Sequence, residues 1–135
     1  PLLCILNDDV IIDSKTFKYL SKNIDDSIGI VGLDYTNYNY TGFNPVFSEI
    51  VFRPYAFGCC MFILKNKYVQ IPDDIKVFFN DDFLLYKIKG KKLVFSNVEV
   101  RGSVSTSIND PKVSEATNSI KQADEEAFRK IISQC

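Results

Sequence analysis

Three oxygen-bearing side chains, Asn7, Asp8 and Asp9, follow directly after the apolar run Leu2–Leu6. Such a run predicts a buried strand, and open α/β sheets bind ligands beyond the carboxyl ends of their strands. Carboxylate and amide oxygens suit Mg²⁺ or Mn²⁺, which usually keep several waters and bridge to substrate phosphates. The triplet therefore predicts a site for one of these cations, but Asn-Asp-Asp also suits an ordinary turn.

A second acidic cluster, Asn80-Asp81-Asp82, stands at the start of a predicted helix. Carboxylates in this position can cap the helix and complement its positive end. A carboxylate in a partly closed cleft, near other negative charges, has a raised pKa that suits a general base. The sequence leaves both interpretations open.

The segment 35–47 is rich in tyrosine and asparagine, including Tyr38, Asn39 and Tyr40. Aromatic faces and amide groups in alternation suit the binding of a sugar or another ring. A surface loop without any ligand can have the same composition. The segment is therefore a candidate substrate-binding loop.

The composition excludes several classes of function. The chain has 135 residues, 16 basic and 17 acidic side chains, and no histidine, which excludes Ser-His-Asp and Cys-His nucleophiles and histidine zinc sites. Its near-zero net charge gives no support for nucleic-acid binding. We expect no membrane span and no signal peptide, because no apolar run approaches about 20 residues. The four cysteines form no CxxC pair, which excludes a zinc ribbon or a thioredoxin motif. Free cysteine is usually buried, so we expect reduced, buried thiols and a cytoplasmic location.

Apolar runs and helical spacing predict one domain that spans residues 1–135. The main expected strands cover 2–6, 28–33 and 58–64, and the expected helices cover 14–23, 82–89 and 115–133. Shorter strands are expected at 49–52, 93–95 and 98–100, and a mobile loop at 101–109. Alternation of this kind predicts an α/β fold with a mixed, mostly parallel sheet flanked by helices.

Four segments in this order resemble the family 2 glycosyltransferases, which have the GT-A fold of nucleotide-diphospho-sugar transferases. They are LLCILNDDVII, FGCCMFILKN, IPDDIKVFFNDDFLLYKIKGKKLVF and VEVRGSVSTS. The resemblance covers roughly residues 2–107, the second half of such a domain. It implies that the first half, which binds the nucleotide base, belongs to a longer chain. The opening of this sequence on an apolar strand favours the same interpretation.

The resemblance also implies roles for single residues. Asn7 and Asp9 take the first and third positions of the family's DxD-type metal motif. Asp81 matches the family's Glu, and Asp82 matches the Asp that serves as catalytic base in inverting members. Arg101 stands where many members have a metal-binding His, and its fork of donors could instead contact a phosphate. Gly58 begins the strand that lies beneath the acceptor site.

The implied activity is transfer of a sugar from a nucleotide-diphosphate sugar to a hydroxyl acceptor, with Mn²⁺ or Mg²⁺. We expect Asp9 and Asp82 to lie in one cleft, separated by a gap the size of a sugar. Two other classes stay open. One is a noncatalytic carbohydrate-binding or scaffold piece of the same fold, and the other is a metal-dependent α/β enzyme of phosphoryl transfer.

Overall fold

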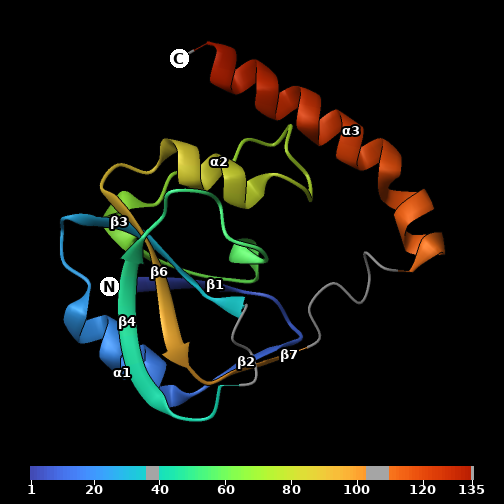
Figure 1. The fold of residues 1–135 in the computed structure, drawn as a ribbon. Coiled ribbons are helices and arrows are strands. Elements are labelled where there is room, and N and C mark those ends of the chain that lie inside the picture. The colour runs from blue at the N-terminus through green and yellow to red at the C-terminus, as the bar shows by residue number, and fades with distance from the viewer. Residues whose placement is uncertain (36–39, 103–109, 135) are drawn as a thin grey trace. The chain divides into compact units, whose positions relative to one another are not determined.

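The computed structural model describes residues 1–35, 40–102 and 110–134 (Figure 1). The described elements are β1 (Leu2–Leu6), β2 (Val10–Ile12), α1 (Ser14–Asn23), β3 (Ile28–Leu33), β4 (Phe43–Glu49), the 3₁₀ turn η2 (Phe57–Cys59), β5 (Cys60–Leu64), the 3₁₀ turn η3 (Lys65–Lys67), α2 (Asn80–Lys87), β6 (Lys91–Val98), β7 (Val100–Gly102) and α3 (Pro111–Ser133). The fold is therefore mixed α/β, as the sequence predicts.

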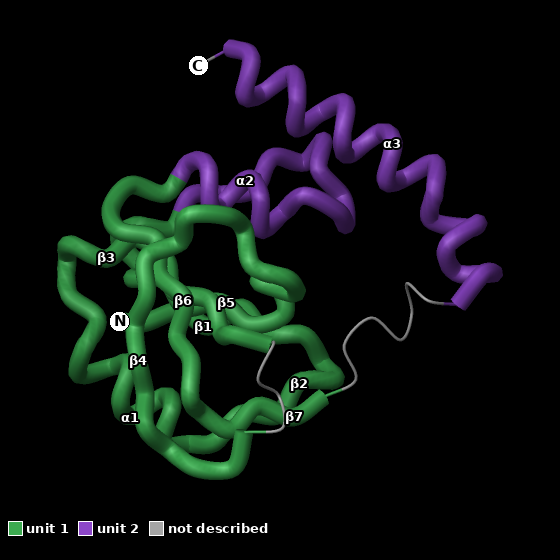
Figure 2. The backbone as a smooth tube through the Cα atoms, in the orientation of Figure 1, with its two compact units in different colours: residues 1–68, 88–104 green, residues 69–87, 105–135 purple. Residues whose placement is uncertain are grey.

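The chain divides into two compact units (Figure 2). Unit 1 comprises Pro1–Tyr68 with Ile88–Val104, and unit 2 comprises Val69–Lys87 with Ser105–Cys135. Unit 1 holds all the described strands, together with α1, whereas unit 2 holds α2 and α3. The expectation that both belong to one domain stays a prediction.

The larger sheet of unit 1 has five strands in the order β1-β5-β3-β6-β4. Only β3 and β6 pair in parallel, whereas β5 is antiparallel to both β1 and β3, and β4 is antiparallel to β6. The expected mostly parallel sheet is therefore wrong for the described strands. The reason is that β5 lies between β1 and β3, which run in the same direction, and is antiparallel to both.

The core of unit 1 lies between this sheet and α1. Every residue of β3 is buried, as its uninterrupted apolar sequence predicts. Helix α1 begins at the predicted residue because the Asp13 carboxylate caps it by accepting the Lys15 backbone N–H at 2.8 Å. Leu20 of α1 is fully buried, and the Phe17 ring meets Phe62 of β5 edge to face at 5.5 Å.

Several sequence predictions are wrong in their boundaries. Strand β1 was expected to be buried, but it is an outer strand and only partly buried. Strand β5 begins at Cys60 rather than Gly58. The strand expected at 49–52 is instead β4, which contains Pro45. Proline lacks a backbone N–H, and it is accommodated here on an edge strand whose pairing with β6 is irregular between Phe43 and Val46.

The other strands and helices also differ in extent. The two strands expected at 93–95 and 98–100 are β6 and β7, and β7 forms a second, two-stranded sheet with β2. Helix α2 begins at Asn80, two residues before the expected start. Helix α3 begins at Pro111, after the capping residue Asp110. No helix among the described residues is long and apolar enough to cross a membrane.

Candidate functional site

The candidate site of unit 1 lies where strands β1, β3 and β6 end. This margin of the five-stranded sheet, formed by strand ends and distinct from the outer strands β1 and β4, is the site edge. The pairings give β1, β3 and β6 a common direction, so their carboxyl ends meet at this edge. The reversed strand β5 brings its amino end, and with it the turn η2, to the same place. The edge therefore gathers residues from four distant parts of the sequence, as is typical of ligand sites in open α/β sheets.

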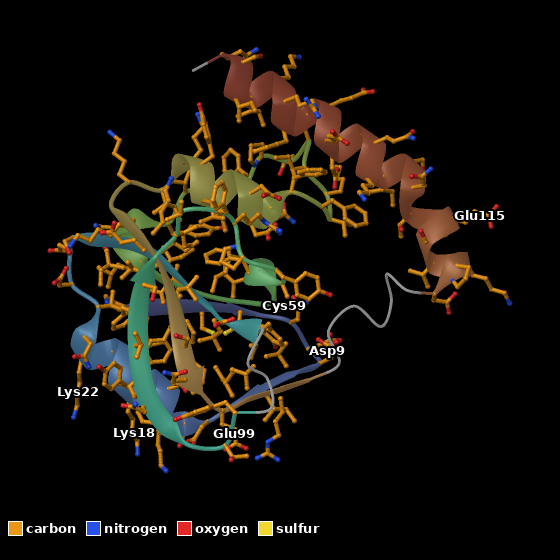
Figure 3. The ribbon with its side chains drawn as sticks, in the orientation of Figure 1. Asp9, Lys18, Lys22, Cys59, Glu99 and Glu115 are labelled. Atoms are coloured by element: carbon orange, nitrogen blue, oxygen red, sulfur yellow. The ribbon has the colours of Figure 1, made fainter. Side chains whose placement is uncertain are left out.

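The predicted metal motif forms a tight turn at this edge. The Asn7 carbonyl accepts the Val10 N–H at 3.3 Å, and the side chains of Asn7, Asp8 and Asp9 are exposed. The Asn7 N–H donates to the carbonyl of Cys59 at 2.9 Å, and its amide nitrogen donates to the Cys59 sulfur at 3.6 Å. The turn is thus tied to η2, and Figure 3 shows Asp9 and Cys59 at this edge.

The position of η2, and with it of Gly58, depends on a close contact inside the sheet. The Phe57 ring is fully buried and lies directly on Gly32 of β3. A Cβ at position 32 would come within 2.1 Å of the ring, so only glycine fits there. Gly58 follows Phe57 directly, and the Gly32–Phe57 contact holds it at the site edge.

Tyr35 also lies at this edge, two residues beyond the end of β3. Its side chain is 2% exposed, and its hydroxyl has no hydrogen-bond partner within the described part of the chain. Burial raises the pKa of Tyr35 well above its ordinary value, and the neighbouring Cys59, Cys60 and Asp9 raise it further. The hydroxyl is a buried donor, and such groups usually have a partner.

Arg101 extends from β7 and is engaged by a neighbouring carboxylate. Its Nε lies 2.8 Å from Oε1 of Glu99, and 69% of the arginine side chain is exposed. The β2–β7 pairing carries Arg101 toward the metal motif, because Gly102 lies opposite Val10. A Cβ on Gly102 would come within 2.5 Å of the Asp9 carbonyl oxygen, so β7 packs closely on the turn.

The donor set at the turn is suitable for a hard divalent cation but incomplete. Asp8, Asp9 and the Asn7 amide offer oxygen ligands, and Mg²⁺ is commonly held by one or two carboxylates plus substrate phosphates. No cluster of three or more His, Cys, Asp or Glu side chains that could hold a metal occurs in the described ranges. A cation here would therefore depend on oxygens of a bound substrate and on water.

The aromatic loop is described only in part. Tyr38 and Asn39 lie outside the described residues, so their predicted role in sugar binding stays a prediction. Tyr40 is half-buried, and its ring lies over Gly42, where a Cβ would be 3.2 Å from the hydroxyl.

The predicted catalytic pair, Asp81 and Asp82, belongs to unit 2. Both residues lie in the first turn of α2, which suits a carboxylate at the positive end of a helix. The first backbone bond of this helix runs from the Phe83 N–H to the Phe79 carbonyl at 2.8 Å. The expected shared cleft of Asp9 and Asp82 stays a prediction, because these residues belong to different units.

The thiols differ from the sequence prediction. Cys60 is buried, but Cys4 and Cys59 are only half-buried, and none of the three forms a disulfide in the described part of the chain. A hydrogen bond from Cys60 lowers the pKa of Cys4. The same hydrogen bond is the main reason why the pKa of Cys60 is raised, and burial of Cys60 is the second reason. Cys59 lies in the η2 turn rather than in a strand, and its sulfur accepts a hydrogen bond from the side-chain amide of Asn7.

Sequence reasoning missed two residues of this edge, Cys59 and Glu99, whereas Tyr35 is the first residue of the predicted substrate-binding loop. Glu99 had a signal, since an acidic side chain two positions before Arg101 is close enough in sequence to pair with it. A separate open hollow of about 580 Å³ lies at the opposite edge of the sheet, lined by Ser27, Glu49, Ile50, Gly90, Lys91 and Lys92. It contains none of the predicted site residues.

Comparisons of this chain with protein-family models, curated proteins and solved structures found no match.

Proposed function

We propose that this chain forms part of a metal-dependent, inverting glycosyltransferase, which moves a sugar from a nucleoside diphosphate sugar to an acceptor hydroxyl. One observation supports the proposal most. The Asn7–Asp9 turn, the η2 turn and Tyr35, the first residue of the aromatic loop, lie together at the carboxyl ends of three strands of common direction. That edge is where α/β folds bind phosphorylated ligands.

In this proposal, Asp9 holds the cation with the help of Asn7 and Asp8. A divalent cation there supplies Lewis-acid stabilisation for the negative charge of the departing diphosphate. Arg101 adds a positive side chain beside the turn. Arg101 pairs with Glu99 through Nε, and its side chain is 69% exposed, so the guanidinium is accessible to a phosphate oxygen.

Asp82 is the proposed general base. An acceptor hydroxyl is a poor nucleophile at neutral pH, so its proton must be removed as it attacks. The hydroxyl attacks the sugar carbon from the face opposite the diphosphate, which inverts that carbon. Asp82 and the cation therefore act on opposite sides of the sugar and do not share one metal. The reduced thiols are compatible with the proposed cytoplasmic location.

The experiment is a hydrolysis and transfer assay of the intact protein on UDP-, GDP-, ADP- and dTDP-sugars. Each donor is incubated with Mn²⁺, with Mg²⁺ or with EDTA, in the presence and absence of sugar acceptors. We expect release of one nucleoside diphosphate that requires the cation and increases with an acceptor. Cleavage of phosphate esters alone would indicate a phosphoryl-transfer enzyme. Sugar binding without any cleavage would indicate a noncatalytic carbohydrate-binding piece.

A further inference from the structure

Unit 2 contains a buried carboxylate that the proposed reaction does not use. Asp124 of α3 is fully buried, although the rest of this helix is exposed or half-buried where it is described. Its Oδ1 accepts the Lys76 N–H at 2.9 Å, and its Oδ2 accepts the N–H groups of Val77 and Phe78 at 2.8 and 2.7 Å. One side chain thus holds three consecutive backbone donors.

An aromatic contact one helical turn further along α3 continues this attachment. Phe128 stacks on Phe79 with ring centroids 5.7 Å apart and an interplanar angle of 19°. Because Asp124 and Phe128 are four residues apart, they lie on the same face of α3. Together they hold the whole segment 76–79.

The segment 76–79 fixes the start of α2. Phe79 has φ 63°, a left-handed conformation that is costly for an aromatic residue and persists only where its surroundings enforce it. The Asn80 side chain donates to the Val77 carbonyl at 3.2 Å, and Phe79 accepts the first backbone bond of α2. The direction of the first turn of α2 therefore depends on the conformation that Asp124 and Phe128 hold.

We propose that Asp124 is a positioning residue for the acidic pair Asp81-Asp82, an inference that rests on the proposed role of Asp82 as general base. Asp82 is only three residues beyond Phe79, so a change in the segment 76–79 moves the carboxylate directly. The chemistry of a base depends on its distance from the proton that it accepts, and a displacement of about 1 Å can cost about 10²-fold in rate. Asp124 itself touches no reacting atom.

The test compares three variants of Asp124 and Phe128 with a matched control in the intact protein. Asp124→Asn is nearly isosteric, but its NH₂ group faces at least one backbone N–H in either orientation and cannot accept it. Asp124→Glu keeps the carboxylate, and Phe128→Leu weakens only the aromatic contact. Glu125→Gln is the control, because Glu125 neighbours Asp124 in sequence and pairs with Arg129 on the exposed side at 2.8 Å.

The readouts are hydrogen–deuterium exchange of the 76–83 amides, and kcat and KM for hydrolysis of the active nucleotide sugar. Rates are measured at a temperature where circular dichroism shows each variant fully folded. For Asp124→Asn we expect faster exchange and a kcat about 10- to 100-fold lower, with KM for the donor unchanged. Phe128→Leu should show a smaller loss, Asp124→Glu a partial recovery, and Glu125→Gln no change.

The inference is overturned if Asp124→Asn and Phe128→Leu exchange faster but keep the wild-type kcat. That result would leave the proposed transferase activity intact and make Asp124 a stabilising residue only. If the wild-type protein cleaves no nucleotide sugar, the proposed function fails, and this inference fails with it. The two failures are therefore distinguishable from one set of assays.

Discussion

Phe78 donates its backbone N–H to Oδ2 of Asp124 over 2.7 Å, and this bond links α3 to the segment that leads into α2. Burial alone would raise the pKa of Asp124, because it disfavours the charged form. The N–H groups of Lys76, Val77 and Phe78 outweigh burial and hold the pKa of this carboxyl below its usual range.

This shift predicts a stability contribution that acid removes. A carboxyl whose pKa is lower in the folded state than in the unfolded state stabilises the fold above about pH 4, and the contribution is lost as pH falls through the folded pKa. We expect the free energy of unfolding, measured with urea, to fall less between pH 5 and pH 2 in Asp124→Asn than in wild type. Asp25 also has a lowered pKa, caused mainly by Ser27, so only the difference between the proteins reports on Asp124. Equal acid sensitivity in both proteins would contradict the prediction.

Asp9→Asn tests the metal site. The change keeps the shape of the turn but removes a charged oxygen ligand, so we expect a loss of cation dependence and a fall in kcat of about 10²-fold or more. Asp13→Asn is the matched control, because asparagine is an equally good helix cap and Asp13 caps α1. Unchanged turnover and unchanged Mn²⁺ dependence in Asp9→Asn would rule out this residue as a ligand.

Asp82→Asn tests the proposed base. The amide keeps the size of the side chain and some capping ability but cannot accept the acceptor's proton. We expect kcat to fall by about 10²–10⁴-fold, with the donor dissociation constant little changed. Asp81→Asn is measured beside it to decide which member of the pair is the base. Near-normal turnover in Asp82→Asn with a large loss in Asp81→Asn would transfer the role of base to Asp81.

Gly32→Ala tests the contact that holds η2 at the site edge. The new methyl group would collide with the Phe57 ring, and we expect a loss of about 1–3 kcal/mol in the free energy of unfolding. Phe57→Leu removes part of the ring and makes room for the methyl group. The double variant should therefore be more stable than the sum of the two single losses predicts, by at least about 0.5 kcal/mol. Strict additivity, measured by urea denaturation, would show that the two residues are not coupled.

The sequence predicted correctly those helices and strands that are specified by neighbouring residues, such as a capping residue or an apolar run. Helix α1 has a capping Asp13 before its apolar spacing, and β3 is an uninterrupted apolar run, so both were predicted with the correct bounds. Strand β4 was missed because Pro45 and the surrounding polar residues indicate a loop. Only its edge position, which is a property of the whole sheet, makes a strand with proline possible.

The direction of a strand is also a property of the whole sheet. The sequence of β5 contains nothing that distinguishes antiparallel from parallel pairing, so the prediction of a mostly parallel sheet was wrong. For the site, the polar triplet after the apolar run Leu2–Leu6 was sufficient to predict that Asn7 and Asp8 follow a strand, whereas Arg101 was singled out only by the family resemblance. Asp124 had a signal that was overlooked, since it interrupts the apolar side of α3 four residues before Phe128.

Pro45 affects the tendency of this protein to aggregate by strand addition at β4. Strand β4 is one of the two outer strands of the five-stranded sheet, and the free edge of an outer strand can offer its backbone groups to another extended chain. Pro45 removes one donor from that edge, and the irregular pairing between Phe43 and Val46 interrupts the regular spacing of the others. This edge is therefore a poor template for aggregation by strand addition, even though Val46 at its centre is exposed and apolar.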